Sequence, residues 1–157
     1  MNVVVMGVSG SGKTTIGALL AARLGCAFLD GDDFHPPANV KKMAAGTPLT
    51  DADRLPWLKA LNEKLRQDRN AVLACSALKE SYRRILAEGL DDCRLVHLRG
   101  SIELIRSRLG ERKHRYMPAS LLESQFATLE PPMDAIEVDI AAAPGKCVEL
   151  IACALTR

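Results

Sequence analysis

The first residues with a chemical signature form a glycine-rich segment, GVSGSGKTT, directly after a run of valines. Gly7, Gly12, Lys13 and Thr14 satisfy the pattern G-x-x-x-x-G-K-[ST]. In this pattern the glycines let backbone N–H groups point at phosphate oxygens, the lysine reaches the β- and γ-phosphates, and the hydroxyl binds Mg²⁺. The sequence therefore predicts a nucleotide-phosphate loop, comprising Gly7, Val8, Ser9, Gly10, Ser11, Gly12, Lys13, Thr14 and Thr15.

Two alternatives compete with this interpretation of the loop. An ordinary glycine-rich turn is disfavoured because the complete motif lies between an expected strand and an expected helix, the setting that it requires. Guanine-nucleotide switch proteins share the loop but also need an N-K-x-D motif, and this sequence contains none. The sequence therefore favours a phosphate site that belongs to another class of nucleotide-binding protein.

A second group of chemical residues follows in the segment FLDGDDFHPPANVKKM. Asp30 and Asp32 are spaced i, i+2 at the carboxyl end of an expected strand, the edge at which open α/β sheets bind ligands. Asp33 and His35 come next, and a solvated acidic loop is the alternative for any one of them. We favour a functional role for Asp30 and Asp32, because that edge also carries the phosphate loop, and we leave Asp33 open.

Cationic side chains follow the third expected strand, in the segment LACSALKESYRR. Lys79 and Arg83 are four residues apart, so on a helix they would share one face. Together with Arg54 from the preceding helical segment, and with Ser76 nearby, they could hold an acceptor that carries a carboxylate. The alternative is an exposed basic surface.

A third group is concentrated in IRSRLGERKHRYMPAS. Its six basic residues are Arg106, Arg108, Arg112, Lys113, His114 and Arg115. We expect a mobile lid over residues 110–120, since an arginine brought in by closure can stabilise the charge that develops in phosphoryl transfer. A solvated basic helix end is the alternative for some of these residues.

The elements that must position these groups alternate between strands and helices, which is typical of an α/β fold with a parallel sheet. The expected strands cover residues 3–6, 27–29, 71–74, 94–98 and 136–138. The expected helices cover residues 13–24, 38–45, 51–66, 79–88, 102–110, 119–129 and 145–155. We find no repeat or linker, so we expect one domain over residues 1–157.

Composition narrows the class of protein further. Apolar residues make up 48% and charged residues 25%, ordinary values for a globular domain. The formal net charge of +2 is too balanced to indicate attraction to nucleic acid or to a membrane surface. Five scattered cysteines without a C-x-x-C pair suggest reduced thiols, and no signal peptide or membrane span is apparent, so we expect a cytoplasmic protein.

Several longer motifs resemble the small phosphate-loop gluconokinases. They are FLDGDDFHPPANVKKM, DADRLPWL, CSALKESYRRIL and SLLESQFATLEPP, and the resemblance extends over nearly the whole chain. It implies ATP-dependent phosphorylation of D-gluconate to 6-phospho-D-gluconate, at the entry to the pentose phosphate and Entner–Doudoroff routes. It also implies a P-loop NTPase fold with a five-stranded parallel sheet in the order 2-3-1-4-5, Mg²⁺ as cofactor, and often a homodimer.

The resemblance implies roles for individual residues. The residues that line the acceptor pocket would be Asp32, His35, Arg54, Lys79 and Arg83. Asp30 and Thr14 would serve Mg²⁺, and Arg108 and Arg112 resemble an R-L-x-x-R at the lid entrance that meets adenine and phosphates. Catalysis would rest on Lys13, Asp32, Arg112 and Arg115.

Two positions need comment. Relatives often read Gly-His where this chain has His114-Arg115, so the role of Arg115 is open. Residues 139–144, which end at Pro144, would close around adenine through backbone groups.

Two other functions remain open from the sequence. The chain could phosphorylate another small hydroxy acid such as shikimate, although the glycine-rich third-strand motif of shikimate kinases is replaced here by CSALK. It could also be a regulatory nucleotide-binding module without activity. The presence of Lys13, Thr14, Asp30 and Asp32 argues against that second possibility.

Overall fold

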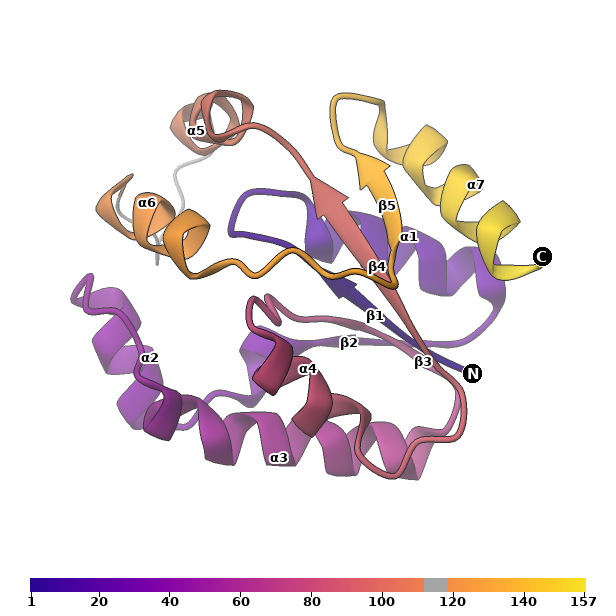
Figure 1. Cartoon of the computed structure of the whole chain (residues 1–157), viewed down its shortest axis with the longest axis horizontal. Helices are drawn as coiled ribbons and strands as arrows, with labels where there is room; N and C mark the ends of the chain where they lie inside the picture. The colour runs from indigo at the N-terminus through magenta and orange to yellow at the C-terminus, as the bar shows by residue number, and fades with distance from the viewer. Residues whose placement is uncertain (112–118) are drawn as a thin grey trace.

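The computed structural model describes residues 1–111 and 119–157. Five strands form one parallel sheet in the order β2-β3-β1-β4-β5, which confirms the expected fold (Figure 1). The strands are β1 (Asn2–Met6), β2 (Ala27–Asp30), β3 (Ala71–Ala74), β4 (Cys93–Arg99) and β5 (Ile136–Asp139). Each strand lies within one residue of its expected bounds at either end, because short apolar runs bounded by polar residues mark buried strands well.

Seven α-helices connect or flank these strands in the described residues. They are α1 (Lys13–Leu24), α2 (Pro37–Ala44), α3 (Asp51–Asp68), α4 (Glu80–Ala87), α5 (Ile102–Glu111), α6 (Ala119–Thr128) and α7 (Pro144–Leu155). Their bounds differ from the expected ones by at most two residues. A short 3₁₀ helix, η1 (Gly31–Phe34), occupies a stretch that the sequence suggested only as a loop.

The start of α3 shows how local sequence fixes an element of the site. The Thr50 hydroxyl accepts a hydrogen bond from the Asp53 N–H at 3.1 Å, and the Asp53 carboxylate accepts one from the Thr50 N–H at 2.9 Å. This reciprocal capping box satisfies N–H groups that the helix cannot pair internally. It fixes the first turn of α3, which carries the side chains of Asp51 and Arg54.

Two hydrophobic cores lie on the two faces of the sheet, and β1 contributes to both. Val3 and Val5 pack into the core shared with α1 and α7, whereas Val4 and Met6 pack into the core shared with α3 and α4. This alternation follows from the period of two along a strand. Figure 1 shows the sheet between these two helical layers.

The strands all point toward one end of the molecule, where α2, α5 and α6 gather, while both termini lie at the other end (Figure 1). The loops after β1, β2 and β3 therefore meet at the carboxyl edge of the sheet, where α/β proteins bind ligands. Among the described residues, no helix combines the length and the apolar character needed to cross a membrane.

Candidate active site

The loop between β1 and α1 has the backbone geometry that its glycines suggest. Gly10 and Gly12 have φ angles of 83° and 94°, in the left-handed region that residues with a Cβ atom rarely adopt. Gly12 is the N-cap residue of α1, so the positive end of a 12-residue helix begins at the loop. The loop and the helix terminus together form a site suited to anionic phosphate groups.

Lys13 folds back over this loop, with its ammonium group 3.0 Å from the carbonyl oxygen of Val8. Burial lowers the pKa of Lys13, while the negative charges of Asp32 and Asp30 oppose this change. The side chain lines two adjoining cavities, one along the phosphate loop and one beyond it. Lys13 therefore stands at the boundary between the two cavities.

The metal-binding residues expected from the sequence lie together. The Thr14 hydroxyl donates to the Asp30 carboxylate at 3.2 Å, which joins the first turn of α1 to the end of β2. The other Asp30 oxygen accepts the backbone N–H of Asp32 at 3.0 Å and so caps η1. A hydroxyl beside a carboxylate offers the hard oxygen ligands that Mg²⁺ prefers, so these residues fit the ion that the sequence implies.

The larger cavity, of about 250 Å³, extends from Lys13 and Asp32 toward α3 and α6. Its lining combines residues of the segment after β2, of α2 and α3, of the segment after β3 and of α6. Among them are Asp32, Asp33, His35, Arg54, Trp57, Ser76, Leu121, Ser124, Gln125 and Thr128. Asp32 and Lys13 also line the smaller cavity of about 130 Å³ along the loop, so these side chains form part of the wall of both compartments.

His35 forms one wall of the larger cavity. Its ring stacks on Trp57 with centroids 4.1 Å apart, and it contacts the Asn39 amide at 3.2 Å through Nδ1. Burial lowers the pKa of His35, only partly opposed by Asp32, whose carboxylate is 4.0 Å from Nε2. The imidazole is therefore neutral at pH 7, and it presents a hydrogen-bonding ring rather than a charge.

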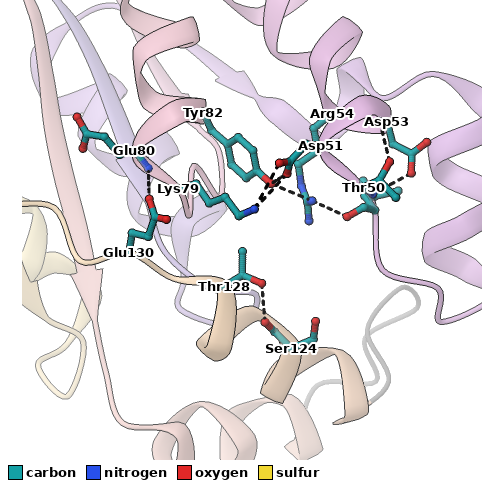
Figure 2. Close-up of polar contacts among 11 residues, drawn as sticks. Thr50, Asp51, Asp53, Arg54, Lys79, Glu80, Tyr82, Ser124, Thr128 and Glu130 are labelled. Atoms are coloured by element: carbon teal, nitrogen blue, oxygen red, sulfur yellow. Dashed lines mark hydrogen bonds and ion pairs between the residues drawn. The ribbon is translucent and has the colours of Figure 1, made fainter.

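Arg54 and Lys79 lie near each other beyond this wall (Figure 2). Arg54 lines the cavity, and its Nη1 donates to the Leu49 carbonyl at 2.5 Å and to the Tyr82 hydroxyl at 3.1 Å. Lys79 pairs with Asp51 at 3.3 Å and is not among the residues that line the cavity. Of the two cations, Arg54 is therefore the one placed to meet a ligand directly.

Arg83 differs from the expectation that it shares a helix face with Lys79. Lys79 is the N-cap residue that precedes α4, whereas Arg83 lies within the helix and is 9% exposed. Its guanidinium donates to the carbonyl oxygens of Ala77 at 2.8 Å and Glu130 at 2.9 Å. These contacts anchor the chain after α6, and they give no support to the prediction that Arg83 binds the acceptor.

The residues expected near adenine are partly brought together. Nη2 of Arg108 donates to the Ile140 carbonyl at 2.5 Å, so the end of α5 contacts residues 139–144. Pro144 begins α7. Arg112 and Arg115 lie outside the described residues, as does most of the expected lid, and their roles stay predictions.

Several cavity residues received no role from the sequence. Gln125 accepts the Ser9 N–H at 2.7 Å and so connects α6 to the phosphate loop, and Thr128 lies one turn away from Ser124 on α6. The spacing of these three residues within SQFATLE could have indicated a shared helix face. Trp57 also lines the cavity, and its indole donates to the Gly31 carbonyl at 2.7 Å.

A five-stranded parallel sheet, a phosphate loop and an adjoining polar cavity with an aspartate at the junction define a P-loop kinase of small molecules. Comparison with known proteins agrees with this class. Residues 9–129 match the family model described as shikimate kinase.

More specific relatives are enzymes named for gluconate. A gluconokinase from Gluconobacter oxydans is 53% identical over 83% of this chain and 76% of its own length. A probable gluconokinase from Xenopus tropicalis is 48% identical over 84% of this chain and 80% of its own. The crystal structure of a gluconokinase from Sinorhizobium meliloti has a TM-score of 0.92 and 42% identity, covering 99% of this chain and 91% of its own. The chain belongs to the gluconokinase family.

Proposed function

We propose that this protein transfers the γ-phosphoryl group of ATP to the primary hydroxyl of D-gluconate and forms 6-phospho-D-gluconate. The observation that carries the proposal is that Lys13 and Asp32 line both the phosphate-loop cavity and the larger cavity. Donor and acceptor bound in these compartments would meet at one cation and one carboxylate. The names of the relatives then select gluconate among small acceptors.

The side chains at this junction supply positioning and charge, which dominate the catalysis of phosphoryl transfer. The Lys13 ammonium neutralises the charge on the transferred phosphoryl group. Asp32 orients the primary hydroxyl and accepts its proton as the bond to phosphorus forms. His35, neutral and stacked on Trp57, offers a ring nitrogen to the sugar hydroxyls.

Thr14 and Asp30 would hold Mg²⁺ and its water shell, and the ion would supply charge neutralisation at the phosphates. In the wall of the larger cavity, Arg54 would bind the acceptor's carboxylate through charge-assisted hydrogen bonds. An anionic group at one end and a hydroxyl at the other describe a sugar acid better than a neutral sugar.

The remaining parts of the proposal follow from the resemblance to the gluconokinases and from the composition of the chain. Arg112 and Arg115 would act from a lid over residues 110–120, and Arg108 and Pro144 would lie at the adenine. We also propose a cytoplasmic location, in accordance with five free thiols. A homodimer remains a prediction from the resemblance alone.

The decisive experiment measures ADP release by the purified protein with gluconate, shikimate and nucleoside monophosphates in turn. We expect release with gluconate alone and a ³¹P signal of a phosphate ester on the terminal carbon. Release with shikimate instead would establish the other hydroxy-acid function. If no acceptor stimulated ADP release, the regulatory module would be the better description.

A further inference from the structure

Four polar side chains form a connected group beside the larger cavity, which Arg54 lines. We call Arg54, Tyr82, Asp51 and Lys79 the carboxylate-end cluster (Figure 2). Arg54 donates to the Tyr82 hydroxyl at 3.1 Å, Tyr82 donates to the Asp51 carboxylate, and Lys79 pairs with the same carboxylate at 3.3 Å. A single chain of contacts therefore joins both cations of this region.

Tyr82 is the fixed centre of this cluster. The residue is 4% exposed and packs in the core between α3 and α4, so its ring has little freedom. The Arg54 guanidinium carbon lies 5.2 Å and the Lys79 ammonium 5.6 Å from the ring centroid, within the range of cation–π attraction. The rigid ring and its hydroxyl thus hold the two flexible cations near one place.

Among the described residues, the hydrogen bonds of Arg54 use one nitrogen of its guanidinium. Those to Tyr82 and to Leu49 both come from Nη1. A guanidinium has three further N–H donors, on Nη2 and Nε. Because Arg54 lines the cavity, a ligand carboxylate can reach these donors without breaking the contact with Tyr82.

The cluster carries one net positive charge. Its two cations face one carboxylate, since the hydrogen bond from Tyr82 and the contact with Lys79 hold the pKa of Asp51 below its usual range. The negative charge of Asp53, on the same helix, is compensated by Lys42, whose ammonium lies 2.8 Å from its carboxylate. Asp51 therefore compensates Lys79 and leaves the charge of Arg54 uncompensated.

We propose that Tyr82 and Asp51 are positioning residues for the acceptor: Tyr82 aims Arg54 at its carboxylate, and Asp51 cancels the second cation so that this carboxylate meets one net positive charge. This inference rests on the proposed function, and it adds the residues that set the charge which the acceptor's carboxylate meets. The competing explanation is that the cluster only joins α3 to α4.

Tyr82→Phe separates these explanations, because it keeps the buried ring and removes the hydroxyl. We expect the KM for gluconate to rise about tenfold, as for a lost hydrogen bond to a charged group, while the KM for ATP and kcat change less than about twofold. A merely structural role would lower the melting temperature and leave the KM for gluconate unchanged, and that result would overturn the proposal.

Asp51→Asn tests the charge balance, with Asp68→Asn as the matched control. Asp68 is on the same helix, pairs with Lys64 at 3.5 Å and takes no part in the cluster, so its substitution removes the same charge elsewhere. We measure inhibition by the neutral polyol D-glucitol against the KM for gluconate. In Asp51→Asn the ratio of the inhibition constant to that KM should rise by about twofold to fivefold, the effect of a partly exposed charge that the carboxylate meets and the polyol does not, and it should stay constant in Asp68→Asn. An unchanged ratio in Asp51→Asn would overturn the assignment of Asp51.

The wild-type protein in the same assay separates this inference from the function on which it rests. Turnover of gluconate by the wild type, combined with unaltered constants in both variants, overturns the inference alone. Absence of gluconate turnover in the wild type overturns the proposed function and the inference with it. If Tyr82→Phe does not fold, the ratio of the inhibition constant to the KM for gluconate in Asp51→Asn still tests the proposal.

Discussion

The phosphate end and the acceptor end of the site share Lys13 and Asp32, yet the chain builds them in different ways. The phosphate end uses consecutive residues of one loop and the start of α1, and much of its binding capacity comes from backbone N–H groups. The acceptor end collects side chains from the segments after β2 and β3 and from α2, α3 and α6.

This difference has consequences for specificity. A backbone cradle recognises phosphate, which is common to many donors, and its geometry is encoded locally by glycines. An acceptor pocket made of side chains from several elements can change its ligand through single substitutions, while the sheet and the loop stay the same. The substitutions below test whether the two ends are separable in this way.

The largest effect should come from Lys13→Ala at the junction. We expect the rate to fall by about 10² to 10³ or more, because a positioned cation is lost where negative charge develops. The melting temperature should stay within a few degrees, since within residues 1–111 and 119–157 the ammonium group hydrogen-bonds only the Val8 carbonyl. Lys59→Ala, at an exposed position of α3, is the control. Turnover at the wild-type rate would remove the loop from the mechanism.

The second largest effect should come from Asp32→Asn, which keeps the shape of the side chain and removes the proton acceptor. We expect kcat to fall by about 10² while binding of gluconate survives in part. Asp33→Asn is the informative comparison, because Asp33 lines the larger cavity without lining the smaller one. Equal losses in both variants would mean that charge in the cavity, rather than contact with the hydroxyl, explains the effect.

The phosphate end could be predicted almost completely from the sequence. Its residues are contiguous, and the i, i+2 spacing of Asp30 and Asp32 at a strand end was enough to place both at the cavities. The sheet was equally predictable, since buried strands such as β3 are short apolar runs. Local sequence determines these features, so local reasoning finds them.

The acceptor end was predicted only in part. Arg54 and His35 line the cavity as expected, but the pairing of Lys79 with Asp51 and the burial of Arg83 depend on how α3 packs against α4. No spacing in the sequence reveals that packing. The role of Tyr82 could not be predicted for the same reason. A lone tyrosine in a helix is typical of a core residue, and only the contacts with Arg54 and Asp51 give its hydroxyl a role.

A smaller effect should follow from Asp30→Asn. Asparagine can still accept the Asp32 N–H and so preserve the cap of η1, but it loses the charge that favours a hydrated dication. We expect the Mg²⁺ concentration for half-maximal rate to rise several-fold, with little change in the KM for gluconate. A Mg²⁺ effect confined to Asp32→Asn would show that the two aspartates have exchanged roles.

The smallest effect should be on the pH dependence of the free energy of unfolding. Two histidines contribute to it, His35 in the wall of the larger cavity and His97 outside the site. Burial lowers the pKa of both His35 and His97 below the ordinary value of 6.5. The unfolded chain therefore binds protons near pH 6.5 that the folded chain does not, so the free energy of unfolding should fall as the pH drops below that value, by at most about 1.4 kcal/mol per pH unit for each histidine.

Other shifted groups act outside this pH window. The pKa values of Asp51 and Asp53 are lowered from 3.8, the latter to about 2, so their contributions to stability are lost only below pH 4. Urea unfolding between pH 7.5 and pH 5 therefore isolates the histidines, and His35→Gln should reduce the pH slope without abolishing it, because His97 remains. A slope identical to that of the wild type would mean that His35 is not held neutral beside Asp32. The assignment of a neutral imidazole to the wall of the larger cavity would then be wrong.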